Sequence, residues 1–150
     1  MAYNFNFYAP TEVVFGKETE RKVGKLVKKQ GCNKVLLHYG GQSAERSGLL
    51  KTIRQSLDTE NIQYVELGGV VPNPRLSLVY KGIELCREEQ VDFILAVGGG
   101  SVIDSAKAIG YGMANEGDVW DFYEYTRQAD DCLPIGAVLT IAEAGSEMSD

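Results

Sequence analysis

The sequence predicts an α/β protein built on a doubly wound parallel sheet, and three observations support this prediction. Short apolar runs of strand length alternate along the chain with longer stretches of helical periodicity. The apolar runs lack the polar alternation of a half-exposed strand, which is typical of parallel strands buried on both faces. One run, Phe93–Val97, leads through glycines directly into a helical pattern. Together these features indicate a Rossmann-like sheet whose ligands bind at the carboxyl ends of the strands.

The first part of the chain predicts two short strands and a helix. Residues 2–8 alternate loosely, Pro10 breaks the pattern, and Glu12–Phe15 resumes it. Lys17–Gln30 has the periodicity of a helix with lysines on its outer side, and Gly31 follows as a C-terminal cap.

The middle of the chain predicts two further strand–helix units. We expect strands at Lys34–Tyr39 and Gln63–Leu67, and helices at Ser47–Leu57 and Leu76–Glu89. The second strand and the second helix are joined by Val70–Arg75, which reads V-V-P-N-P-R. This loop should be rigid, because two prolines flank one asparagine.

The strand at Phe93–Val97 ends at the glycine run Gly98, Gly99 and Gly100, and a helix is expected from Ser101 onward. The first N–H groups of a helix lack partners within it, and the helix dipole is positive at that end. The junction therefore predicts a phosphate-binding site.

A structural interpretation of the same junction stays open. Ser101 and Asp104 have the spacing of a capping box, and glycines end many strands for steric reasons. The glycines do not form the GxGxxG fingerprint, because Ile103 stands where the third glycine should be, and no GK[ST] follows as in a P-loop.

The last part of the chain predicts an acidic surface segment at Gly117–Asp131 and a buried strand at Leu133–Thr140. No internal repeat, low-complexity tract or linker interrupts the pattern. We therefore expect one domain, residues 1–150.

The composition excludes several classes of function. The 150 residues carry a net charge of −6 without a basic cluster, which disfavours binding to nucleic acid or to an anionic membrane. No apolar stretch approaches the roughly 18 residues of a membrane span. Cys32, Cys86 and Cys132 are an odd number at wide spacing, which indicates a reducing compartment, and we expect the cytoplasm.

Four polar or glycine-containing loops follow the expected strands, and the fold should bring them to one crevice. They are Gly40–Ser43, Pro72–Arg75, Gly98–Asp104 and Thr140–Ser149. A nucleotide with an extended phosphate is the ligand that such a crevice favours.

The residues bring no evident catalytic machinery. His38 is the only histidine and lies in an apolar strand, so a structural role is expected. The carboxylates of Glu143 and Glu147 have no histidine or cysteine beside them, which argues against a metal site.

Three segments together resemble the iron-containing alcohol dehydrogenases, and the butanol dehydrogenase branch in particular. They are P-N-P-R at 72–75, G-G-G-S-V-I-D-S-A-K at 98–107, and L-T at 139–140 with G-S-E-M at 145–148. The start of the chain, with Pro10-Thr11 and F-G-K at 15–17, is similar as well. Where the family often has A-A-T-G-S-E, this chain has A-E-A-G-S-E at 142–147, with Glu143 and Ala144 as departures.

The resemblance implies which residues bind NAD or NADP. Gly98, Gly99, Gly100, Ser101 and Asp104 would hold the pyrophosphate and the nearby ribose. Asn73 and Thr140 would face the nicotinamide, Ser149 would lie near the cofactor, and Gly40, Gly41 and Ser43 would hold the adenosine ribose. These eleven positions are the expected cofactor site.

The resemblance also implies an activity. It is the NAD(P)-dependent interconversion of a primary alcohol and an aldehyde, assisted by Fe²⁺ or Zn²⁺, in a homodimer. The metal ligands of the family belong to a helical C-terminal domain, so we expect no catalytic or metal-binding residue here and regard residues 1–150 as the cofactor domain, truncated at its C-terminal end. The alternatives are a relative of glycerol dehydrogenase or dehydroquinate synthase, and a nucleotide-binding module without catalysis.

Two further expectations concern the cofactor. The strand that ends at Tyr39 is followed by Gly40 and Gly41 without an acid to repel a 2′-phosphate, which favours NADP over NAD. Replacing Gly98 by aspartate is expected to abolish cofactor binding while leaving the fold largely intact, because the glycine permits close approach of the pyrophosphate.

Overall fold

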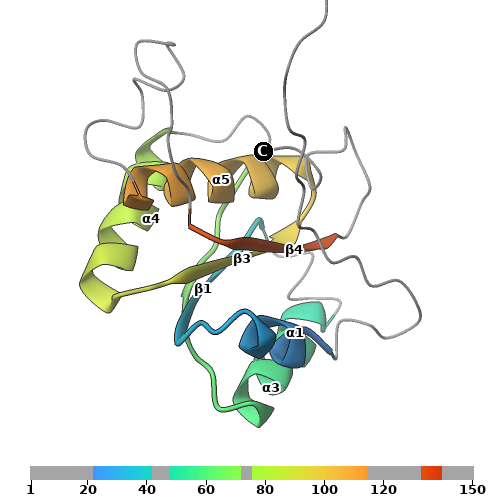
Figure 1. The fold of residues 1–150 in the computed structure, drawn as a ribbon. Helices are drawn as coiled ribbons and strands as arrows, with labels where there is room; N and C mark the ends of the chain where they lie inside the picture. The colour runs from blue at the N-terminus through green and yellow to red at the C-terminus, as the bar shows by residue number, and fades with distance from the viewer. Residues whose placement is uncertain (1–21, 42–47, 72–75, 115–132, 140–150) are drawn as a thin grey trace, which may run out of the picture.

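The computed structural model describes residues 22–41, 48–71, 76–114 and 133–139, which form a parallel sheet with helices on both faces (Figure 1). The elements in chain order are α1 (Val23–Lys29), β1 (Lys34–Tyr39), α3 (Leu49–Thr59), β2 (Gln63–Leu67), α4 (Leu76–Glu89), β3 (Phe93–Gly98), α5 (Gly100–Ala114) and β4 (Ile135–Leu139).

The four strands lie in the order β2-β1-β3-β4, and every neighbouring pair is parallel. From β1 the chain passes through α3 to β2 on one side, and then through α4 to β3 on the other side of β1. The winding direction therefore reverses between β1 and β3, which is the topological switch point where open α/β sheets bind ligands. The predicted doubly wound sheet is confirmed.

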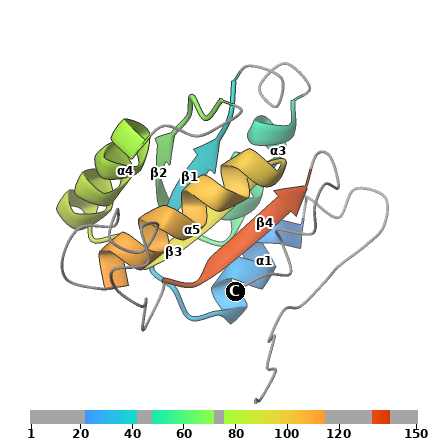
Figure 2. The ribbon, with the colours of Figure 1, turned by 90° about the horizontal axis from the view of Figure 1, so that it is seen from above.

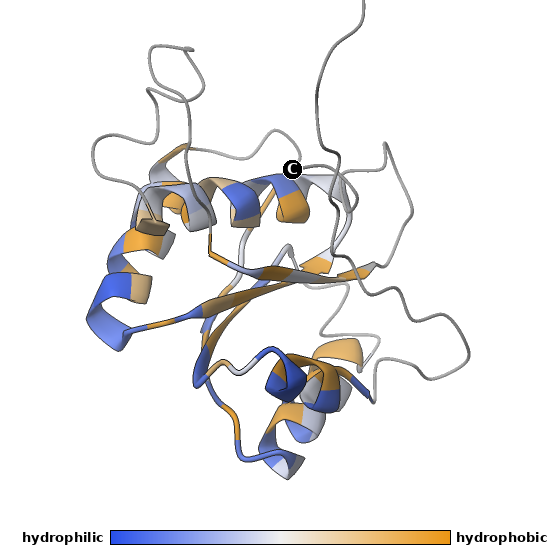
Figure 3. Cartoon of the chain, in the orientation of Figure 1, coloured by the Kyte–Doolittle hydropathy of each residue, from blue (hydrophilic) through white to orange (hydrophobic). Residues whose placement is uncertain are grey.

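Two apolar clusters hold the helices to the sheet, one on each face. Alternate residues of β1 and β3 point to opposite faces, as the pleat requires. The cluster on one face includes Leu36, Ile94 and residues of α4 and α5, whereas the other includes Val35, Leu37 and residues of α1 and α3. Figure 2 shows α5 lying over the sheet, and Figure 3 shows the strands coloured mainly apolar between helices with polar outer sides.

Most predicted elements within the described residues are confirmed, and three boundaries agree residue for residue: β1, β2 and α4. The helix predicted at Ser47–Leu57 runs instead from Leu49 to Thr59, because Gly48 has a left-handed backbone (φ 80°) that a helix cannot include. The strand predicted from Leu133 begins at Ile135, since the Leu133 N–H donates to the Gly110 carbonyl of α5.

Other predictions lie outside the described residues: the strands at 2–8 and 12–15, the surface segment at 117–131 and the segment after Thr140. The part of the chain that the structure describes contains no helix with both the length and the apolar character needed to cross a membrane.

Candidate functional site

The switch point is built from glycines at the carboxyl ends of two neighbouring strands. Tyr39 pairs with Val97 across β1 and β3, so Gly40 and Gly41 lie beside the glycine run that begins at Gly98. Side chains are thus missing at the place where the sheet opens, and the backbone is accessible to a ligand.

The loop after β2 joins the same place. The Gly69 N–H donates to the Gly40 carbonyl at 2.8 Å, and the Val70 N–H donates to the Tyr39 carbonyl at 3.3 Å. These two bonds tie the loop to the end of β1, so the carboxyl ends of three adjacent strands form one edge.

Val102, in the first turn of α5, packs where the glycines leave room. A Cβ atom on Gly98 would lie 2.7 Å from Val102 Cγ2, and one on Gly40 would lie 3.7 Å from it and 3.2 Å from the Val70 carbonyl oxygen. Gly98 also has a φ of 149°, which side-chain-bearing residues rarely adopt. Glycine at the strand ends therefore lets the first turn of α5 approach the sheet.

The start of α5 offers donors for an anion. The Gly99 carbonyl accepts hydrogen bonds from the N–H groups of Val102 and Ile103 at 3.1 and 3.2 Å, so the helical ladder begins there. The N–H groups of Gly100 and Ser101 precede that ladder and have no partner within the helix. A 15-residue helix whose first N–H groups lack partners within it, with glycines beside its start, fits a phosphate-bearing cofactor.

Seven of the expected cofactor residues lie in the described part of the chain. The structure brings six of them to the switch point: Gly40, Gly41, Gly98, Gly99, Gly100 and Ser101. Asp104 lies one turn into α5 with an exposed side chain. Ser43, Asn73, Thr140 and Ser149 lie outside the described residues, and their roles stay predictions.

The structure argues against the expectation that Gly98→Asp would leave the fold largely intact. Its Cβ atom would overlap Val102 Cγ2, at a φ that strains any residue with a side chain. A change at Gly40 is also restricted, by the Val70 carbonyl oxygen. Gly41 is the suitable position for a substitution, because its Cβ atom would have no neighbour within 4 Å.

His38 lies beneath the site and is fully buried. Nδ1 lies 2.8 Å from the Leu67 carbonyl oxygen and Nε2 lies 2.8 Å from Ser105 Oγ. A carbonyl only accepts, so Nδ1 carries the proton and the Ser105 hydroxyl donates to Nε2. Burial lowers the pKa of His38 to about 4, although the Leu67 bond opposes the shift. The predicted structural role of this neutral histidine agrees with these contacts.

Sequence reasoning missed three residues that shape the site: Val70, Val102 and Ser105. Two of them had a signal in the sequence, since Val102 follows the glycine run directly and Ser105 falls on the face of α5 that is otherwise apolar. The contact of Val70 with β1 had none, because it depends on which strands are neighbours.

Catalytic groups are scarce in the described residues. They contain no cluster of three or more histidine, cysteine or carboxylate side chains that could hold a metal ion. Burial raises the pKa of the Cys86 thiol to about 12, so it is not a thiolate near neutral pH.

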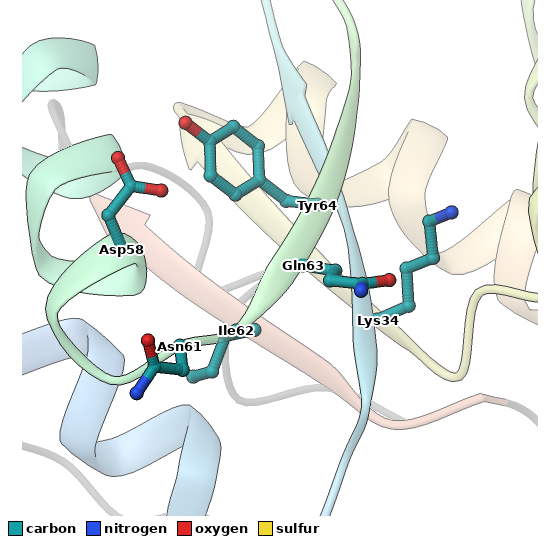
Figure 4. A pocket seen from close by; sticks show the side chains of 6 residues that line it. All are labelled: Lys34, Asp58, Asn61, Ile62, Gln63 and Tyr64. Carbon is teal, nitrogen blue, oxygen red and sulfur yellow. The ribbon is translucent and has the colours of Figure 1, made fainter.

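A shallow hollow lies at the opposite edge of the sheet (Figure 4). Its lining comes from the starts of β1 and β2 and from the end of α3: Lys34, Asp58, Asn61, Ile62, Gln63 and Tyr64. Ligands of doubly wound sheets bind at the carboxyl ends, so this hollow at the amino ends is not the expected cofactor site.

Comparison with known proteins identifies relatives along nearly the whole chain. The family model for iron-containing alcohol dehydrogenase matches residues 10–150. A probable NADH-dependent butanol dehydrogenase 2 of Bacillus subtilis is 51% identical over 97% of this chain and 37% of its own length. The NADPH-dependent aldehyde reductase YqhD of Escherichia coli is 33% identical over 96% of this chain and 37% of its own length.

A solved structure agrees with the fold. The NADH-dependent butanol dehydrogenase A of Thermotoga maritima superposes with a TM-score of 0.92 at 46% identity, covering 97% of this chain and 36% of that protein. The chain thus spans a little over one third of the length of these relatives.

Proposed function

The chain belongs to the iron-containing alcohol dehydrogenase family, and from this premise we propose that residues 1–150 form the NAD(P)-binding part of an alcohol dehydrogenase or aldehyde reductase. The observation that carries the proposal is the start of α5 at the switch point. Glycines at the carboxyl ends of β1 and β3 flank it, and the N–H groups of Gly100 and Ser101 have no partner within the helix. Such a place binds the phosphates of a dinucleotide.

Within this site the chain would bind and orient the cofactor. The N–H groups that start α5 would hold the pyrophosphate, and Gly40 and Gly41 would give the adenosine ribose room beside β1. Asp104, exposed one turn further, would approach the ribose next to the pyrophosphate. The bound nicotinamide would supply or accept the hydride.

The substrate would be a small primary alcohol or aldehyde, as the names of the relatives indicate for those proteins. A divalent metal, iron or zinc, would polarise the substrate oxygen. We propose, from the resemblance to the family, that its ligands lie outside residues 1–150, which span only 37% of the length of these relatives.

Two observations bear on the choice between NADH and NADPH. Gly40 and Gly41 follow β1 where NAD-dependent enzymes commonly have an acid, so nothing at these two positions repels a 2′-phosphate. Relatives at 42–51% identity are named NADH-dependent, whereas one at 33% is named NADPH-dependent. We propose that the protein uses NADH and also binds NADPH.

We further propose a cytoplasmic homodimer. Cys32 and Cys86 are free thiols, which suits a reducing compartment. The dimer rests on family resemblance, in which the N-terminal strand region pairs across subunits. Light scattering before and after deletion of residues 1–9 tests it, and an unchanged oligomeric state would count against this pairing.

The activity is tested on the purified full-length protein, loaded with Fe²⁺ without oxygen or with Zn²⁺. We expect NADH to bind, and butanal to be reduced with oxidation of NADH. Binding without turnover under either metal would instead favour the nucleotide-binding module. No binding of NADH or NADPH would refute the proposed site.

A further inference from the structure

The hydrogen bond between His38 and Ser105 joins the central strand to the helix that starts at the candidate cofactor site. His38 lies on β1, where it pairs with Leu67 of β2 and Ala96 of β3. Ser105 lies on α5, one turn after Ser101. Both side chains are buried, with 0% and 1% of their surfaces exposed.

Apolar packing of α5 against the sheet has no direction of its own. The buried face of the helix is rich in small residues, among them Ala106, Ala108, Gly110 and Gly112, and Ala96 lies on the strand beneath. Small side chains form shallow ridges, and the hydrophobic effect has no direction. The larger Ile103 and Ile109 on the same face are fully packed and limit the position of α5, and a directional contact restricts it further.

The hydrogen bond between His38 and Ser105 supplies such a directional contact. The Nδ1–H of His38 is fixed on the Leu67 carbonyl, so the ring cannot turn, and Nε2 presents one lone pair at one place. The Ser105 hydroxyl must meet this lone pair at 2.8 Å, because a buried acceptor without a donor is costly. Val102, one turn earlier on α5, packs against the glycines at the strand ends. The two contacts together define both the depth and the rotation of the first turns of α5.

We infer that His38 and Ser105 are positioning residues for the cofactor: through their hydrogen bond they hold the N–H groups of Gly100 and Ser101 in line with the pyrophosphate. The inference rests on the proposed function. Neither side chain touches the cofactor, since both are buried below the strand ends. They act through α5.

The test is a double-mutant cycle on NADH affinity in the full-length protein, with the melting temperature measured in parallel. Ser105→Ala removes the donor, and His38→Asn keeps a donor for Leu67 while losing the acceptor for Ser105. We expect each variant to bind NADH about tenfold more weakly, because small misplacements of binding groups are costly. The double variant should bind no more weakly than either single variant, as expected for residues that act as a pair.

Ser56→Ala is the matched control. Ser56 is also a buried helical serine, and its hydroxyl accepts a hydrogen bond from the Gly24 N–H at 2.8 Å, but it lies on α3 at the other face of the sheet. We expect this variant to melt at a lower temperature and to bind NADH with unchanged affinity. If His38 and Ser105 had a purely structural role, NADH affinity would fall in proportion to the melting temperature in every variant, Ser56→Ala included.

Three outcomes overturn the inference alone: unchanged NADH affinity in both single variants, additive losses in the double variant, or an equal loss in Ser56→Ala. Failure of the unmutated protein to bind NADH or NADPH overturns the proposed function, and this inference with it.

Discussion

The amino and carboxyl edges of the sheet differ in what their backbone N–H groups bind. At the amino edge the Asp92 carboxylate, just before β3, accepts hydrogen bonds from the N–H groups of Asn33 and Lys34 at 2.9–3.1 Å. At the carboxyl edge the N–H groups of Gly100 and Ser101 have no carboxylate bound to them among the described residues. Among the described residues, the chain thus supplies its own anion at the amino edge and none at the carboxyl edge.

The difference shows what makes an edge a binding site. Both edges carry backbone donors, and the hollow lies at the amino edge. Neither backbone donors nor a hollow therefore marks the edge that is expected to bind the cofactor. Glycines and the start of α5 distinguish the carboxyl edge, because the glycines let α5 approach the strand ends and its first N–H groups have no partner within the helix.

The largest of these effects is expected at Gly98, where a close contact coincides with a backbone conformation that favours glycine. Gly98→Ala introduces a Cβ atom 2.7 Å from Val102 Cγ2 at a φ of 149°. Backbone strain and overpacking should together lower the free energy of unfolding by about 2–5 kcal/mol, measured by urea denaturation.

Gly41→Ala is the control for this prediction, since its Cβ atom would meet nothing within 4 Å. Its stability should stay within about 0.5 kcal/mol of the unmutated protein. Equal stabilities of the two variants would show that Val102 does not pack against the strand end as described.

The second prediction concerns His38, whose pKa burial lowers from 6.5 to about 4. The unfolded chain takes up this proton as the pH falls through 6.5, while the folded protein resists it until about pH 4. The contribution of His38 to the free energy of unfolding should therefore be fully present above pH 6.5. It should fall by up to about 3 kcal/mol as the pH drops towards 4.

The measurement is urea denaturation at a series of pH values, compared between the unmutated protein and His38→Asn. His38 is the only histidine, so the difference between the two curves reports it alone. Parallel curves would mean that the ring is accessible to protons in the folded state.

The third prediction tests the space beside β1. Gly41→Asp places a carboxylate at the carboxyl edge, at a position where the added Cβ atom meets nothing within 4 Å. We expect about tenfold weaker NADPH binding, because the new charge repels the 2′-phosphate, and little change for NADH. Calorimetric titration of both cofactors measures this, and an equal loss for the two would contradict the placement of the adenosine ribose.

The smallest effect is expected at the amino edge. Asp92→Ala removes the acceptor for the Asn33 and Lys34 N–H groups, which are partly exposed. We expect a loss of about 1 kcal/mol in the free energy of unfolding and no change in NADH affinity. Asp58→Ala serves as the control, because Asp58 is an exposed carboxylate that lines the hollow at this edge. Weaker NADH binding by Asp92→Ala would contradict the proposal that only the carboxyl edge binds the cofactor.

Much of the fold was predictable because it depends on local pattern. Apolar strand runs and helical periodicity placed β1, β2 and α4 at their observed bounds. The start of α3 was missed because it depends on the left-handed backbone of Gly48, which periodicity does not report. The start of β4 depends on a tertiary hydrogen bond from Leu133 to α5.

The candidate site was predictable only in part. The glycine run, a helix that starts beside it and the structural character of His38 were visible in the sequence, although α5 begins at Gly100 and not at Ser101. The order of the strands could not be predicted. The packing of Val102 against Gly40 and Gly98 depends on that order, so it could not be predicted either. The partner of His38 is also invisible, since 67 residues separate it from Ser105.

The central claim, that the start of α5 binds the cofactor pyrophosphate, is tested most directly at Ser101. Ser101→Asp places a negative charge in the first turn, where it stabilises the helix by roughly 0.3–1 kcal/mol but repels a bound phosphate. Ser101→Asn is the neutral control of similar shape. NADH titration by fluorescence should show affinity at least about 100-fold lower for aspartate than for asparagine, with an equal or higher melting temperature. Equal affinity in the two variants would contradict the claim.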